Sequence, residues 1–243
     1  DSLELVTLQE AFLVDSTNVD VIDCLSSYYA SKGDVEHRLD YDLMLMRSEN
    51  LPVRDKLHRL HSYTYDLDFY ADNYFRVGAL VQALAIMHPD DRAVVKSYAS
   101  HMLLSGDREQ ALDYLRRHLS DSTAGVDDYI YVMQLEHYID RRDLLFEDLS
   151  TAMELYPANF DLYSFAGFVY GDYGYYKEAI YIFKLLLDVA TNDEQRSSLW
   201  GCIGDIYHEQ GKDSKAFKSY DKALRYNGDN VLVLNNYAYF LSL

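Results

Sequence analysis

Residues 197–230 read SSLWGCIGDIYHEQGKDSKAFKSYDKALRYNGDN, and this segment carries the clearest structural signal in the chain. Apolar residues recur at helical spacing on both sides of Gly211. A glycine at that point can adopt a positive φ and close the first helix. The segment therefore predicts two helices joined by a tight turn, in a unit of about 34 residues.

The same layout recurs along the chain. Gly106 and Gly174 are separated by twice the length of this unit, and Pro89 and Pro157 have the same separation. Each glycine follows one helix-like stretch and precedes another. Each proline follows the second helix, which it stops because it lacks an N–H group and disfavours helix in the residue before it. The chain is therefore predicted to be a stack of helix–turn–helix units.

This unit resembles the tetratricopeptide repeat. Its W-x2-L-G-x2-Y pattern and the small and large residues that follow it are carried by Trp200, Ile203, Gly204, Tyr207, Ala216, Tyr220 and Ala223. Gly228 stands where the family usually has proline. The resemblance implies an all-α fold, a right-handed alpha-alpha superhelix (TPR solenoid) whose first helices line a concave wall.

The register covers the whole sequence as six whole units plus a half unit at each end. The predicted units are 1–18 (second helix only), 19–52, 53–91, 92–125, 126–159, 160–193, 197–230 and 231–243 (first helix only). Residues 53–57 are expected to lengthen the first helix of their unit. The half units and the apolar last residues suggest a fragment of a longer chain.

Residues 233–243, VLNNYAYFLSL, are also similar to the closing repeats of Bacteroidetes-type bacterial TPR proteins. Many such proteins are exported or lipid-anchored. This resemblance favours a periplasmic or cell-envelope location over a cytoplasmic one.

Composition disfavours several function classes. The chain has 22 Lys+Arg against 40 Asp+Glu, a net charge of -18, which disfavours binding to nucleic acids and to anionic membranes. The longest nearly apolar run, 77–87, is too short for direct membrane insertion, since a spanning helix needs about 20 residues. No disulfide framework is expected, because the two cysteines, Cys24 and Cys202, lie far apart in the sequence.

No catalytic motif is present, and we expect neither an enzyme nor a cofactor. His58 and His61 are close enough in sequence to share a helix face, but no cysteine or carboxylate stands at ligand spacing beside them. No metal site is therefore predicted. An acid/base pair assembled from separate repeats stays open at this point.

Function is expected on the concave wall. The inward positions of the first helices carry eight acids against two bases, Arg59 and Lys96. TPR modules that grip a peptide carboxylate use Lys, Asn and Arg there, but Lys96 is followed by Ser100 instead of Asn. The candidate groove residues are Asp127, Ile130, Gln134, His137, Tyr138, Ser164, Phe168, Asp172, Asp205, His208 and Glu209.

These residues predict a non-catalytic scaffold that binds a protein or peptide of basic or aromatic character in an acidic groove. The alternative interpretation of the acidic residues at the inward positions is that they only keep the concave wall hydrated. The alternative function is a sensory or regulatory region of a larger bacterial protein, such as an exported receptor. Apolar faces near the two ends predict end-to-end self-association; they lie around Leu3, Val6, Leu8, Leu234, Tyr237 and Leu241.

Overall fold

The computed structural model describes residues 2–119 and 124–241. Within these ranges every regular element is an α-helix and no strand is present. The chain divides into two compact units, Asp1–Asp121 and Ser122–Leu243. None of the described helices is both long and apolar enough to cross a membrane. The last two positions of the predicted final half unit, 242 and 243, lie outside the described residues.

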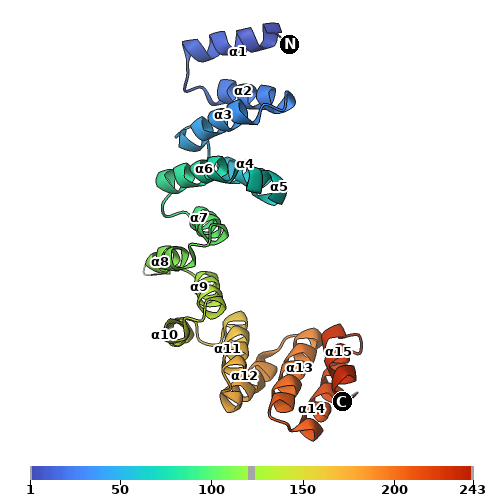
Figure 1. Ribbon diagram of the computed structural model, residues 1–243. Coiled ribbons are helices and arrows are strands. Elements are labelled where there is room, and N and C mark those ends of the chain that lie inside the picture. Colours follow the sequence, from blue (N-terminus) through green and yellow to red (C-terminus); the bar gives the residue numbers. More distant parts are fainter. Residues whose placement is uncertain (1, 120–123, 242–243) are drawn as a thin grey trace. The chain divides into compact units, whose positions relative to one another are not determined.

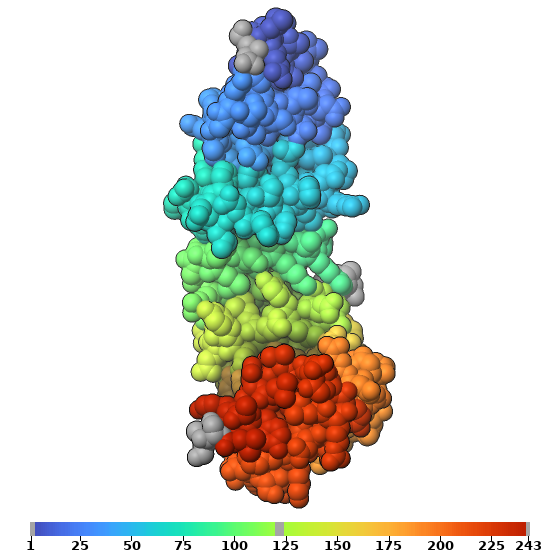
Figure 2. Space-filling model, turned by 90° about the vertical axis from the view of Figure 1, so that its right-hand side faces the viewer, coloured from blue at the N-terminus to red at the C-terminus, as the bar shows by residue number. Residues whose placement is uncertain are grey.

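The first unit is a series of packed helices (Figure 1). Its helices are α1 (Ser2–Val14), α2 (Val19–Ser31), α3 (Val35–Arg47), α4 (Val53–Tyr65), α5 (Leu67–Asp72), α6 (Tyr74–Met87), α7 (Arg92–Leu104) and α8 (Arg108–Leu119). Most of them contact the next helix along the chain, and α3 also packs on α6. Figure 2 shows the same unit, coloured blue to green, as space-filling atoms over the successive helices.

The second unit repeats this construction, and α13 is its longest described helix. Its helices are α9 (Val126–Tyr138), α10 (Arg142–Leu155), α11 (Phe160–Asp172), α12 (Tyr176–Val189), α13 (Asp193–Glu209), α14 (Asp213–Tyr226) and α15 (Val231–Leu241). The most extensive packing joins α13 to α14, the helix pair to which most of residues 197–230 belong.

Asparagine and aspartate side chains start many of these helices. Asn18 Oδ1 accepts hydrogen bonds from the first N–H groups of α2, and Asp91 does the same for α7. Asn159 and Asn192 cap α11 and α13. These side chains satisfy N–H groups that have no partner inside the helix, which fixes where each first helix begins.

Glycines with positive φ close the turns inside the helix pairs. Gly33, Gly106, Gly174 and Gly211 have φ between +67° and +88°. Asp140, midway in sequence between Gly106 and Gly174, has φ +58° in the turn between α9 and α10. Aspartate is among the residues that adopt the left-handed backbone region more readily than most, so the same turn forms here without a glycine.

The first helix of the third predicted unit differs from the sequence expectation. It begins at Val53, but it ends at Tyr65 and a second short helix, α5, follows. Asp66 has an extended backbone (φ −86°, ψ 97°), and its side chain accepts a hydrogen bond from Phe69 N–H. One aspartate therefore ends α4 and caps α5, so the extra residues produce two helices instead of one long helix.

A polar cluster lies inside the first unit, between α2, α3 and α4. Asp42 is fully buried, and Ser26 Oγ and Arg59 Nη1 donate to its Oδ1 at 2.6 and 2.9 Å. The Tyr63 hydroxyl donates to Oδ2. Burial raises the pKa of Tyr63, which keeps the hydroxyl protonated as a donor. In the predicted unit 19–52, Asp42 stands at the position that Phe183 and Tyr220 occupy in their units, and this cluster explains why an acid is found there.

The core of the second unit follows the repeat pattern closely. Ile203, Ala216, Tyr220 and Ala223 are all fully buried. The ring of Tyr220 lies directly over Gly204, where a Cβ would collide with it. The small residues of the pattern therefore make room for the large ones, as the sequence predicted.

Candidate functional site

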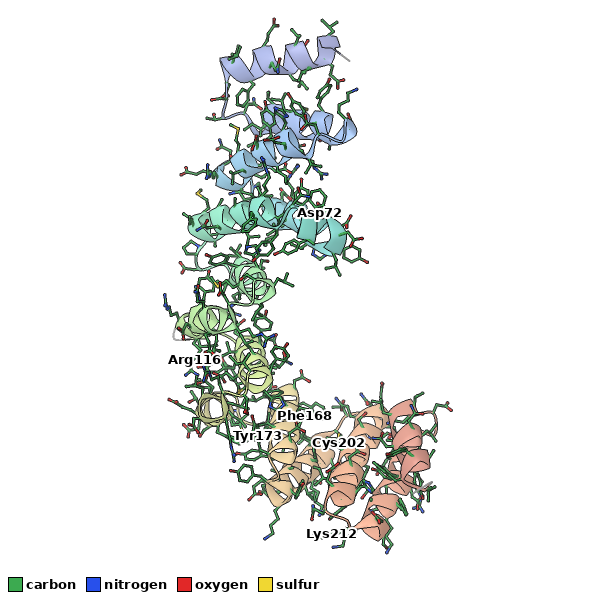
Figure 3. The ribbon with its side chains drawn as sticks, viewed as in Figure 1. Asp72, Arg116, Phe168, Tyr173, Cys202 and Lys212 are labelled. Atoms are coloured by element: carbon green, nitrogen blue, oxygen red, sulfur yellow. The ribbon has the colours of Figure 1, made fainter. Side chains whose placement is uncertain are left out.

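Three first helices of the second unit carry the candidate groove residues. Five of these residues lie on α9, three on α11 and three on α13. Figure 3 shows Phe168 on α11 and Cys202 on α13, the two helices that flank the groove. Helix α9 contacts α11, so its last turn can reach the same site.

Two adjoining cavities lie between α11 and α13, with volumes of about 380 and 480 Å³. Phe168, Phe183 and Cys202 line both of them. The Phe183 ring forms the floor because Gly167 leaves it space; a Cβ there would lie 2.6 Å from Phe183 Cε1. Phe168 is shared by the two cavities and is 53% exposed. We call the two cavities together the α11–α13 groove.

The α11–α13 groove is acidic and aromatic in its described lining. Asp172, Asp205 and Glu209 line one cavity, and Glu194 lines the other. No lysine, arginine or histidine belongs to the described lining of either cavity. Carboxylates beside an exposed aromatic ring can attract cationic side chains by charge and through the ring face.

Of the predicted residues, Ser164, Phe168, Asp172, Asp205 and Glu209 lie in this lining. His137 of α9 joins the groove at its edge. Its Nε2 lies 3.0 Å from Asp172 Oδ2, and its ring meets the Phe168 ring edge-on at 5.7 Å. His137 therefore positions both the acid and the aromatic ring.

Asp205 is engaged inside the protein. The Tyr220 hydroxyl and Asn236 Nδ2 donate to Asp205 Oδ1 at 2.6 and 2.9 Å. Burial raises the pKa of Asp205, although both hydrogen bonds oppose this effect. Asp205 thus ties α13 to α14 and α15 while one side of it faces the groove.

His208 lies outside the lining of both cavities. Its ring stacks on Phe240 at 3.5 Å, and its Nδ1 lies 3.1 Å from Asp213 Oδ1. These contacts give His208 a packing role between α13 and its neighbours. The remaining predicted residues, Asp127, Ile130, Gln134 and Tyr138, lie on α9 and do not line either cavity.

Cys202 lines both cavities, but its thiol is not activated. Burial, reinforced by the nearby Asp205 carboxylate, raises the pKa of Cys202 to about 11. The thiol is therefore protonated near neutral pH, and a thiol in that state is a poor nucleophile. Among the described residues, no group of three or more His, Cys, Asp or Glu side chains could hold a metal ion.

Glu194 and Gln195 are among the lining residues that the sequence analysis missed. The repeat register left positions 194–196 outside any unit, whereas the structure begins α13 at Asp193. A signal was present in the sequence: Asn192 is a helix-capping residue and is followed at once by two acids. The added turn lengthens α13 and supplies one wall of the second cavity.

No family model matches the chain, and no curated protein matches it. Solved structures do. The crystal structure of TTC0263, a thermophilic TPR protein in Thermus thermophilus, matches with a TM-score of 0.55 and 18% identity over 79% of this chain and 100% of that one. The crystal structure of the MamA protein matches with a TM-score of 0.53 and 17% identity, over 72% and 93% of the two chains.

The structure of YrrB, described as a TPR protein with an unusual peptide-binding site, matches with a TM-score of 0.51. It is 13% identical, and the match covers 95% of this chain and 97% of that one. Together with the all-helical composition of the described residues, these likenesses give the fold class. The chain has the alpha-alpha solenoid fold of TPR proteins, as its sequence predicted.

Proposed function

We propose that this chain is a non-catalytic scaffold that holds a protein or peptide segment of basic or aromatic character in the α11–α13 groove. The observation that carries the proposal is the position of Phe168. Its ring is half exposed, lines two adjoining cavities and has an acidic rim around it. A rigid aromatic ring beside an open cavity is the kind of anchor that dominates binding energies.

The rest of the groove supports the same role. Phe183 and Gly167 give it a well-packed floor, and His137 holds Phe168 and Asp172 from the side. A groove built on helices and fixed by packing loses little conformational entropy when a ligand binds. The printed description of YrrB names a peptide-binding site in that protein, which is compatible with a peptide ligand here.

The test is fluorescence anisotropy with a short labelled peptide of alternating lysine and phenylalanine. We expect Phe168→Ala to weaken its binding about thirtyfold, the effect of losing an anchor worth about 2 kcal/mol. The free energy of unfolding should fall by no more than about 1.5 kcal/mol, because the half-exposed ring loses chiefly its contact with His137.

Tyr181→Ala is the matched control, because Tyr181 is 64% exposed on α12 and lies outside both cavity linings. It should bind the peptide as the wild type does. Unchanged affinity in Phe168→Ala would overturn the proposal. Parallel losses of affinity and stability would show instead that Phe168 is part of the core.

The similarity of residues 233–243 to Bacteroidetes-type repeats leads us to propose a bacterial protein of that type. The predicted self-association belongs to the same proposal. Leu234 and Leu241 on α15 are exposed, as are Leu3 and Val6 on α1, so apolar faces are available at both ends of the described chain. Sedimentation velocity at increasing protein concentration tests whether these faces associate.

A further inference from the structure

The first unit contains a cavity whose chemistry differs from that of the α11–α13 groove. It lies between α4 and α7 and has a volume of about 660 Å³, within the usual range of ligand sites. We call it the α4–α7 groove. Its ionisable side chains, apart from Tyr70, are Arg54, His58, His61, Lys96 and His101.

No aspartate or glutamate belongs to the described lining of the α4–α7 groove. The chain has 40 acids and only 22 lysines and arginines, so a wall without acids departs from the rest of the molecule. Two permanent cations and three histidines line one cavity there. The described lining therefore carries basic groups and no acids within a strongly negative protein, which favours an anionic ligand at this place.

Two of these side chains are available for a ligand. Arg54 and His58 are exposed, and neither side chain makes a hydrogen bond or ion pair within the described chain. The guanidinium of arginine carries five donors in a fixed fork that matches a carboxylate. Arg54 can therefore bind a carboxylate without first giving up an internal partner.

The opposite wall of the groove is rigid. The Tyr70 hydroxyl bonds to His101 Nδ1, and the His101 ring stacks on Tyr74 at 4.5 Å. Gly78 leaves the space that this ring needs, because a Cβ there would lie 2.6 Å from His101 Nε2. Burial lowers the pKa of His101, so this ring is mainly neutral and acts as a fixed wall.

Apolar side chains lie between the charged ones. Leu60 and Val81 are buried at the base of the groove, whereas Leu104 is 62% exposed beside it. A simple inorganic anion would leave this apolar surface in water. A polypeptide segment can place carboxylates on the cations and apolar side chains on the leucines at the same time.

We propose that the α4–α7 groove binds an acidic polypeptide segment, with a side-chain carboxylate on Arg54 and apolar side chains on Leu57 and Leu104. This is a second site, separate from the α11–α13 groove and of opposite charge preference. Phosphate backbones are disfavoured because the net charge of -18 repels an extended polyanion around the small positive site.

The experiment measures binding of a short labelled peptide of alternating glutamate and leucine, with both termini blocked, by fluorescence anisotropy. Two matched peptides carry glutamine or lysine in place of glutamate. We expect the glutamate peptide to bind at least tenfold more tightly than either. Arg54→Glu should lower its affinity about fivefold or more, since the attraction of an exposed ion pair is lost and replaced by repulsion.

Arg47→Glu is the matched control. Arg47 is exposed on α3, belongs to the same unit and lies outside the lining, so the variant has the same change in net charge. It should bind the glutamate peptide as the wild type does. Circular dichroism checks that both variants keep their helical content, which exposed positions should preserve.

A second measurement needs no variant. A photo-reactive group on the glutamate peptide should cross-link the wild type within residues 54–64 or 93–104, as mapped by mass spectrometry. Cross-links elsewhere would overturn the proposal, as would equal binding of the glutamine peptide or an equal loss in Arg47→Glu. Tighter binding of a single-stranded oligonucleotide of similar charge would assign the groove to nucleic acid instead. Failure of the lysine–phenylalanine peptide at the α11–α13 groove would not affect this result.

Discussion

Asp42 shows how much a single side chain can decide inside a repeat. It occupies a position where the repeat pattern places an apolar side chain, and it accepts hydrogen bonds from Ser26, Arg59 and Tyr63. The acidic residue at this position is visible in the sequence. The hydrogen-bond partners of Asp42, however, are 16 to 21 residues away in the sequence, so a local sequence pattern does not identify them. Only the placement of α4 beside α3 brings Arg59 and Tyr63 to it.

Replacing Asp42 with alanine should lower the free energy of unfolding by about 3–5 kcal/mol. The reason is that the buried Tyr63 hydroxyl would lose its acceptor, and the Arg59 guanidinium would lose its buried carboxylate and keep Asp23 as its remaining acidic partner. Chemical denaturation monitored by circular dichroism measures the change. Asp113→Ala, at an exposed aspartate in the same unit, should stay within about 0.5 kcal/mol of the wild type. A cost below about 1 kcal/mol for Asp42→Ala would mean that the cluster does not stabilise the unit.

Individual groove residues differ in how far the sequence could predict them. Phe168 and Asp172 follow from their place in the repeat, because inward positions recur once in every unit. The internal roles of Asp205 and His208 do not follow, since their partners Asn236 and Phe240 belong to the next helix pair. Position in a repeat gives the direction of a side chain but not its hydrogen bonds.

Helices and their turns were largely predictable from the sequence. Glycine and proline mark the turns, and Asn and Asp mark the helix starts. Insertions were harder, because a fixed period does not say which helix or turn absorbs the extra residues. In the unit with the extra residues 53–57, the structure has two helices that meet at Asp66. The extra residues 194–196 belong to the first turn of α13.

Gly211→Ala should lower the free energy of unfolding by about 1 kcal/mol. Gly211 has φ +67°, and a Cβ there would meet no heavy atom within 4 Å, so the cost comes from backbone conformation alone. Gly228 is the matched control: its φ lies outside the left-handed region, and a Cβ would lie 3.7 Å from Leu224 O. Thermal unfolding should separate the two variants, and equal stability would contradict the assigned role of the Gly211 turn.

Across the chain, stability should be shared among neighbouring helix pairs. Within each unit, helices contact those near them in the chain and few others, which is typical of solenoids. The sequence predicted this stacking. It did not predict the α4–α7 groove, because the basic residues that line this groove come from two different repeats. The number of acidic residues was also summed over all first helices, and this sum does not show that one cavity is lined without aspartate or glutamate.

The exposed apolar residues of α15 lead to a prediction about self-association. Leu232 is 77% exposed and Tyr239 is 61% exposed, on a helix that packs on α13 and α14 with its other side. We expect sedimentation velocity to show dimers at high protein concentration and Leu232→Glu to abolish them. Leu155→Glu, at an exposed leucine on α10, should still dimerise. A wild type that stays monomeric would exclude this contact.

The local reversal of charge in the α4–α7 groove has a kinetic consequence. An acidic segment approaching the molecule first meets the repulsion of a net charge of -18, and salt screens that repulsion beyond about 10 Å at 0.1 M. Inside the groove, the same salt weakens the contact between the segment and Arg54. Added salt should therefore speed both the arrival and the departure of an acidic segment, whereas it should slow the arrival of a basic one at the α11–α13 groove.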